Sequence, residues 1–320
     1  MGVSLFTLGG TIAMAGHSGG GVVARLTGAD LTAAVPGLAE VGELDVRDVH
    51  AVPSASLTFA QVLDVVAAAS RAVDEGATGV VVTQGTDSLE ETAYLADLVW
   101  PHAAPIVFTG AMRNPTMAGA DGPANLLAAV RVAASGAARD LGALVAFSDE
   151  IHAARWVRKT HSTSTATFAS PNAGPVGHVV EGVVRVLATP RRHDPLPMPE
   201  GPVPRVALYT VTLDDDGGLL ERVAETHQGL VVAGFGVGHV SAALAPVLGG
   251  LAERIPVVLA SRTGAGSTLR HTYGAVGSER DLLARGLIGA DLLDPYKARV
   301  LLRLVLATGG DVPAAFAEHG

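Results

Sequence analysis

The sequence predicts an α/β protein with two domains, and two observations carry this prediction. Short apolar runs repeatedly end in turns rich in Gly, Ser and Thr and continue into helix-like stretches, which is typical of a doubly wound, mostly parallel sheet. A run of prolines at residues 190–204 interrupts this alternation, which then resumes. We therefore expect a larger N-terminal domain at residues 1–189, a semi-rigid linker, and a smaller C-terminal α/β domain at 205–320.

Local sequence signals predict the strands and helices of the N-terminal domain. Three consecutive valines between Gly79 and Thr83 indicate a strand that is buried on both faces. Thr58 is a favoured cap before a long helix that stops at Gly76, and Pro36-Gly37 ends a shorter helix. In chain order, the expected strands are Val3–Leu8, Leu44–Val52, Gly79–Thr83, Pro105–Thr109 and Leu141–Phe147, and the expected helices are Leu31–Val35, Phe59–Glu75, one from Ser88, and Asp121–Ala134. A polar, hydroxyl-rich loop is expected at residues 154–165.

The C-terminal domain repeats the alternation on a smaller scale. The expected strands are Arg205–Val211, Gly229–Ala233 and Ile255–Ala260, and the expected helices are Leu219–His227, Ala242–Ala252 and the amphipathic Lys297–Thr308. Glycine-rich turns follow the second and third of these strands.

The composition indicates a soluble, ordered protein without a nucleic-acid partner. Of the 320 residues, 48% are hydrophobic and 17% are charged, which supports a large core and argues against disorder. The net charge of -9 argues against a nucleic-acid partner, because binding nucleic acid requires a basic face. No stretch reaches the roughly 18 apolar residues of a membrane span, and the segment after Met1 lacks the features of a signal peptide. We therefore expect a cytoplasmic protein with no membrane partner.

Several common chemistries are excluded or weakened by what the sequence lacks. The absence of cysteine excludes disulfides, thiol nucleophiles and thiolate metal sites. The eleven histidines form no His-Glu-x-x-His pattern, which argues against a metal. The glycines at 234, 236 and 238 do not complete a dinucleotide loop, because Ser241 occupies a position that requires glycine. No phosphate-binding lysine loop and no Gly-x-Ser-x-Gly nucleophile elbow occurs. We therefore expect neither a metal nor a cofactor.

What remains is a set of hydroxyl and charged residues at strand ends. Thr11 and Thr86 each follow glycine after a predicted strand, and Lys159, one of two lysines in the chain, lies in the hydroxyl-rich loop. A threonine hydroxyl becomes a useful nucleophile when a neighbour takes its proton, and a lysine can do so when desolvation lowers its pKa. Asp87 is able to orient that lysine or to bind an ammonium group. The alternative is that Thr86 and Asp87 simply cap a helix.

Six ordered motifs add a family resemblance that spans most of the chain. They are Leu8-Gly-Gly-Thr-Ile-Ala13, Thr83-Gln-Gly-Thr-Asp-Ser-Leu-Glu-Glu-Thr92, Thr109-Gly-Ala-Met-Arg113, Ala120-Asp-Gly122, Val157-Arg-Lys-Thr160 and Asp294-Pro-Tyr-Lys-Ala-Arg-Val300. In these motifs the chain resembles the bacterial-type L-asparaginase/glutaminase amidohydrolases. The resemblance implies hydrolysis of a side-chain amide, that of L-asparagine first of all, through an acyl-threonine intermediate and without a cofactor.

The resemblance also implies roles for individual residues. Thr11 is expected to be the nucleophile, and the second catalytic group is expected to consist of Thr86, Asp87 and Lys159. Family members form homodimers that pair into homotetramers, with a second subunit completing each site. The expected substrate contacts are Ser56, Gly85, Asp87 and Ala111, together with His239 and Tyr273 from another subunit.

The chain departs from the family pattern around the substrate's amino-acid end. The glycine-rich segment Ala15–Gly28 is a candidate lid, but it lacks the family's tyrosine and offers His17 as its one base near neutral pH. Leu57 stands where a glutamine often follows the serine, and His239 and Tyr273 replace an asparagine and a glutamate. Two alternatives therefore stay open. One is an amidase of the same mechanism acting on another small amide or lactam, and the other is a catalytically silent ligand-binding protein.

Overall fold

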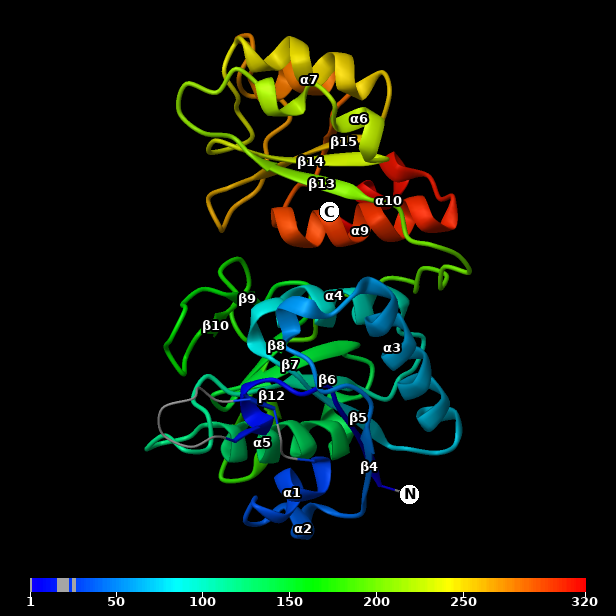
Figure 1. Cartoon of the computed structure of the whole chain (residues 1–320), viewed down its shortest axis with the longest axis vertical. Helices are drawn as coiled ribbons and strands as arrows, with labels where there is room; N and C mark the ends of the chain where they lie inside the picture. Colours follow the sequence, from blue (N-terminus) through cyan, green and yellow to red (C-terminus); the bar gives the residue numbers. More distant parts are fainter. Residues whose placement is uncertain (1, 16–22, 25–26) are drawn as a thin grey trace. The chain divides into compact units, whose positions relative to one another are not determined.

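The computed structural model describes residues 2–15, 23–24 and 27–320, and the chain divides into two compact units, Met1–Pro195 and Leu196–Gly320. Each unit is built around a sheet with helices on both faces (Figure 1). The predicted fold class is therefore confirmed, with a larger first unit and a smaller second one.

The first unit contains one large, mostly parallel sheet. Its strands are β1 (Val3–Thr7), β4 (Leu44–Asp48), β5 (Gly79–Thr83), β6 (Ile106–Thr109), β7 (Ala143–Phe147), β8 (Glu150–Ala153), β11 (Gly177–Val180) and β12 (Val183–Val186). They lie in the order β12-β11-β8-β7-β6-β5-β1-β4. The five strands from β7 to β4 are parallel and match the predicted ones, whereas β8, β11 and β12 extend the sheet by antiparallel pairing.

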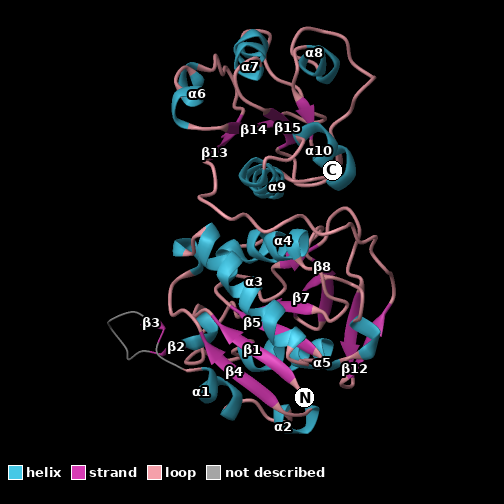
Figure 2. Cartoon of the chain, turned by 90° about the vertical axis from the view of Figure 1, so that its right-hand side faces the viewer, coloured by secondary structure: helices cyan, strands magenta, loops and turns pink. Residues whose placement is uncertain are grey.

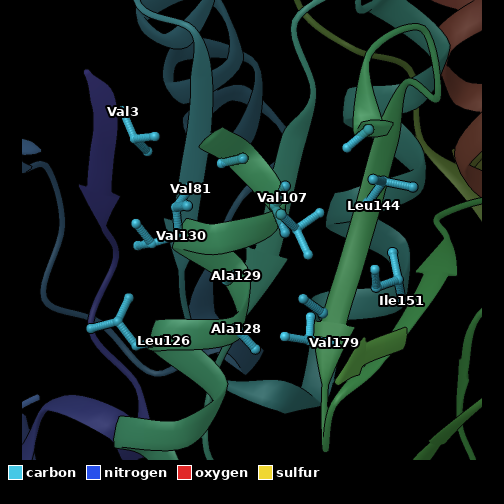
Figure 3. Packing of buried hydrophobic residues seen from close by; sticks show 14 of the residues in the cluster. Val3, Val81, Val107, Leu126, Ala128, Ala129, Val130, Leu144, Ile151 and Val179 are labelled. Carbon is cyan, nitrogen blue, oxygen red and sulfur yellow. The ribbon is translucent and has the colours of Figure 1, made fainter. Parts of the chain in front are cut away.

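Helices cover both faces of this sheet. Figure 1 shows α3 (Phe59–Asp74) and α4 (Leu89–Val99) on one face, and α1 (Gly28–Ala33), α2 (Leu38–Val41) and α5 (Gly122–Ala134) on the other. As predicted, Thr58 caps α3, in a reciprocal arrangement with Gln61. Figure 3 shows how α5 packs Leu126 and Val130 against buried strand residues such as Val81. Burying each such side chain stabilises the fold by about 1.5–3 kcal/mol.

Among the described residues, two short hairpins lie outside the large sheet. β2 (Met14–Ala15) pairs with β3 (Val23–Ala24), and the centre of the candidate lid, including His17, lies outside the described residues. β9 (Arg158–Lys159) pairs with β10 (Phe168–Ala169). The segment expected as a loop at 154–165 therefore contains a strand, which its polar, hydroxyl-rich composition concealed.

The second unit has a smaller sheet that is entirely parallel. β13 (Val206–Thr210), β14 (Gly229–Gly234), β15 (Val257–Ser261) and β16 (Ile288–Gly289) follow one another in chain order. Figure 2 shows α9 (Pro295–Thr308) and α10 (Val312–His319) on one face, and α6 (Val223–Thr226), α7 (Leu244–Ala252) and α8 (Glu279–Ala284) on the other. The helix expected at Leu219–His227 is interrupted: a 3-10 turn at Gly218–Leu220 precedes the four-residue α6. Leu220 is buried in the core of this unit, whereas its neighbour Leu219 is 85% exposed, so the segment is anchored at single positions and not along a continuous apolar helix face.

None of the helices in the described part of the chain is long and apolar enough to cross a membrane.

Candidate active site

The candidate site is built where β1 and β5 end, because these strands are hydrogen-bonded neighbours. Thr7 and Thr83 are register partners at the last position of the pair, and the Leu8 N–H donates to the Thr83 carbonyl oxygen at 2.8 Å. The turns that follow carry Thr11 and Thr86. Parallel strands bring their carboxyl ends to one edge, so motifs that are far apart in the sequence lie together there.

Thr11 opens a short 3-10 helix, η1 (Thr11–Ala13), and its side chain is half-buried. The next residue, Ile12, is buried in the core and lies against the start of α5. A Cβ atom added at Gly122 would lie 2.9 Å from Ile12 Cγ1. Tight packing of Ile12 therefore fixes the turn from behind, while the Thr11 side chain keeps access to solvent.

Thr86, Asp87 and Lys159 form one connected cluster. Lys159 Nζ donates to Thr86 Oγ1 at 3.0 Å and to Asp87 Oδ1 at 2.6 Å. The Thr86 hydroxyl in turn donates to Met112 Sδ at 3.4 Å. The Lys159 side chain is 16% exposed, whereas that of Asp87 is 68% exposed. A lysine in contact with a buried hydroxyl is suited to proton transfer, and the open carboxylate is accessible to a cationic substrate group.

The turn that carries these residues is more than a helix cap. Thr86 begins η3 (Thr86–Ser88), and neither Thr86 nor Asp87 makes the side-chain cap that their residue types favour. Their side chains instead contact Lys159. Helix capping alone, the alternative role of Thr86 and Asp87, therefore does not describe their observed contacts.

A buried serine supports the same turn from a neighbouring loop. Ser54 opens η2 (Ser54–Ser56); its Oγ accepts the Asp87 N–H at 3.2 Å, and its carbonyl oxygen accepts the Ser88 hydroxyl at 2.9 Å. Ser56, the serine expected from the sequence, is exposed at the end of η2. Sequence reasoning missed Ser54, although it lies two residues away in the same Ser-Ala-Ser segment.

Gly85 and Ala111 are held with their backbones at the same edge. Gln84 Nε2 donates to the Gly85 carbonyl oxygen at 3.2 Å, and the Thr92 hydroxyl of α4 fixes the Gln84 side chain at 2.9 Å. Ala111 follows β6 and is buried. Close by, the Asp121 carboxylate accepts the Met112 and Arg113 N–H groups, which fixes the turn after β6. The turns that carry the site are therefore held in place by three further side chains, those of Gln84, Thr92 and Asp121.

The other two expected residues, His239 and Tyr273, lie together in the second unit. Their rings meet edge to face with centroids 4.9 Å apart. Beneath them is Glu279, a buried residue that the sequence analysis did not single out; it accepts the Thr272 and Tyr273 N–H groups and contacts His239 Nε2 at 3.1 Å.

Two opposing effects set the charge of Glu279. Burial on its own raises the pKa of Glu279, but hydrogen bonds from the Tyr273 and Thr272 backbone and from the His239 ring outweigh it. The pKa of Glu279 therefore lies below its ordinary value, and the ionised carboxylate orients His239.

Across the described residues, no group of three or more His, Asp or Glu side chains is arranged to hold a metal ion.

Comparisons with known proteins agree with this geometry. Residues 2–192 match the family model described as Asparaginase, N-terminal, and residues 205–316 match the Glutaminase/Asparaginase C-terminal domain. The chain is 32% identical to an L-asparaginase of Bacillus licheniformis, covering 96% of this chain and 95% of that protein. It is also 32% identical to L-asparaginase 2 of Escherichia coli (strain K12), with coverage of 97% and 90%.

A solved structure shows the same fold along the whole chain. The probable cytoplasmic L-asparaginase from Campylobacter jejuni superimposes with a TM-score of 0.89 at 30% identity, covering 99% of both chains. Fold, site and sequence thus define an amidohydrolase scaffold with threonines at the carboxyl edge of its main sheet. The chain belongs to the asparaginase family.

Proposed function

We propose that this protein hydrolyses the side-chain amide of L-asparagine to L-aspartate and ammonia. The observation that carries the proposal is the contact of Lys159 Nζ with both Thr86 and Asp87, at the edge where the neighbouring turn presents Thr11. Family membership and relatives named L-asparaginase support the same reaction. Among the alternatives, an amidase for another small amide and a silent binding protein have no comparable support.

In the proposed reaction, Thr11 Oγ attacks the carbonyl carbon of the amide. Its proton passes to the second catalytic group, formed by Thr86, Asp87 and Lys159. The C–N bond breaks as the amide nitrogen takes up a proton and leaves as ammonia, and the acyl group remains on Thr11 as an ester. Water then attacks the ester, which releases L-aspartate and returns the proton to Thr11.

The substrate's polar groups have matching partners at the same edge. Asp87 is largely exposed and negatively charged, which suits the α-ammonium group. Ser54 and Ser56 are candidates for the α-carboxylate, and the backbones at Gly85 and Ala111 are proposed to line the pocket. We further propose that the protein works in the cytoplasm as a homodimer or homotetramer, in which His239 and Tyr273 of another copy complete the site.

The decisive test is ammonia release from L-asparagine, L-glutamine and D-asparagine by the wild type and by Thr11→Ala and Lys159→Ala. We expect turnover of L-asparagine that is lost in both variants. A folded wild type that turns over none of the three would sink the asparaginase proposal, and the search would move to other amides.

A further inference from the structure

Lys159 lies outside the large sheet whose strands β1 and β5 position Thr11 and Thr86. It belongs to the two-residue strand β9, which pairs with β10. The next N–H along the strand, that of Thr160, donates to the Thr167 carbonyl oxygen across the hairpin at 2.8 Å. Because successive N–H groups of a strand point in opposite directions, the Lys159 N–H points away from β10.

Glu90 accepts this outward-pointing N–H. The Lys159 backbone nitrogen lies 2.6 Å from Glu90 Oε2, and Glu90 is 6% exposed in the first turn of α4. A hydrogen bond to an ionised acceptor is shorter and stronger than one between neutral groups. Glu90 thus supplies to β9 the acceptor that a further strand would supply in a larger sheet.

The segment that carries Glu90 also holds the other end of Lys159. Thr86 and Asp87, which contact Nζ, lie in η3, and η3 runs directly into α4. Lys159 is therefore held at its backbone and at its ammonium group by one continuous piece of chain. Its flexible four-carbon stem has many conformers. Fixing both ends selects those in which Nζ reaches Thr86.

We propose that Glu90 is a positioning residue for the amide hydrolysis, because it fixes the Lys159 backbone and thereby the place where Nζ meets Thr86. This inference rests on the proposed function. In a helix, an acidic residue in the first turn is usually explained by the helix dipole. The helix dipole does not account for all of Glu90's contacts, because its carboxylate accepts a backbone N–H 69 residues away in the sequence.

The first test is steady-state kinetics with L-asparagine for wild type, Glu90→Ala, Glu90→Gln and Glu91→Gln. Glu91 is the adjacent, half-buried acid of the same helical turn and serves as the matched control. For Glu90→Ala we expect kcat to fall about 10- to 100-fold with KM changed less than about threefold, because a misplaced catalytic group slows the chemical step. Glu90→Gln keeps an oxygen acceptor and is expected to restore most of kcat, while Glu91→Gln matches the wild type.

The second test does not depend on turnover. Lys159 and Lys297 are the two lysines of the chain, so lysine labelled with 13C at Cε gives two NMR signals. Lys297 is buried in the second unit beside Asp294 and is the internal reference. We expect the Lys159 side chain to become more mobile in Glu90→Ala, which narrows and shifts its NMR signal. The Lys297 signal is expected to stay unchanged.

The outcomes separate the two proposals. Wild-type kcat in Glu90→Ala would overturn the inference, and so would a lower kcat that follows the loss of folded protein while the Lys159 signal stays unchanged. If the wild type has no asparaginase activity, the proposed function fails, and the NMR measurement alone decides whether Glu90 positions Lys159.

Discussion

Gly10 lies against Gly85 so closely that a Cβ atom added to Gly10 would stand 2.2 Å from the Gly85 nitrogen. Gly10 also has a φ of 88°, in the region that residues with side chains rarely adopt. The contact joins the turn after β1, which carries Thr11, to the turn after β5, which carries Thr86. The spacing of the two threonines therefore depends on the absence of a side chain at one position.

This contact makes Gly10→Ala a sharp test of the site's construction. The added methyl group must push the two turns apart and strain the backbone, so we expect kcat to fall at least about 100-fold, as for a reacting group displaced by about 1 Å. We also expect a loss of about 1–3 kcal/mol in the free energy of unfolding. Gly136→Ala is the control, since Gly136 has no atoms within 4 Å of an added Cβ. Wild-type kinetics in Gly10→Ala would show that the two turns need not touch.

Ser54 and Ser56 can be separated by single substitutions. Ser54→Ala removes the acceptor of the Asp87 N–H in a buried place, and an unpaired buried donor costs about 1–3 kcal/mol. We expect the free energy of unfolding to fall by about that amount in Ser54→Ala, and kcat/KM for L-asparagine to fall about 10-fold or more because the turn that carries Asp87 is displaced. Ser56→Ala, at an exposed position, is expected to lose less. The reverse order would favour Ser56 as the substrate-binding serine.

Much of the fold was predictable because local signals and tertiary packing agree. The valine run of β5 is buried on both faces, and Thr58 makes the cap that its position predicts. The antiparallel strands β8, β11 and β12 were not predicted. They have four residues each, and Glu150-Ile-His-Ala153 of β8 carries little apolar pattern. The valines of β11 and β12, on either side of Glu181-Gly182, are a hairpin signal that the sequence analysis did not use.

The site residues were predictable where the residue type itself indicates the chemistry. Thr86, Asp87 and Lys159 were selected from the sequence, and the structure brings their side chains together. Ser54, Glu90 and Glu279 were not selected, because their roles depend on which backbone N–H groups meet them in the folded chain. Nothing in the sequence marks the first-turn acid Glu90 as the one that reaches another strand.

A half-buried carboxylate away from the candidate site makes stability depend on pH. Asp97 of α4 accepts the Ala143 N–H at 2.9 Å, and Arg192 and Arg155 lie near it. Burial raises the pKa of Asp97 to about 6 from an ordinary 3.8, and the Ala143 N–H and the two arginines offset only part of this effect. At a pH between the two pKa values, Asp97 is therefore protonated in the folded state and ionised in the unfolded chain.

The sign of the effect follows from proton binding. Between about pH 4 and 6 the folded state binds more protons at Asp97, so this group's contribution to stability falls as pH rises. Two pKa units correspond to about 3 kcal/mol, an upper value here because Asp97 keeps some exposure. Relative to wild type, Asp97→Asn should gain stability as pH rises over this window, measured by urea unfolding at each pH. Asp64→Asn, on the exposed side of α3, is the control. A difference that is constant with pH would contradict the prediction.

The proposal that a second copy completes the site predicts complementation between two defective variants. His239 is one-third exposed and is oriented by Glu279, so its ring is available to a neighbouring copy. We expect Lys159→Ala and His239→Ala each to lower asparaginase activity. A dimer containing one copy of each then has one site with both defects and one site with neither. Two different affinity tags on co-expressed variants isolate this mixed species, which should regain about half of the wild-type activity.

The matched control is a mixture of Thr11→Ala with Lys159→Ala. Both residues lie in the first unit, so every site in that mixed dimer keeps one defect and no activity should return. Recovery in the first mixture and none in the second would establish a site shared between copies. A mixed oligomer without recovery would instead place the whole reaction on one copy of the chain, and wild-type activity in His239→Ala would remove His239 from the site.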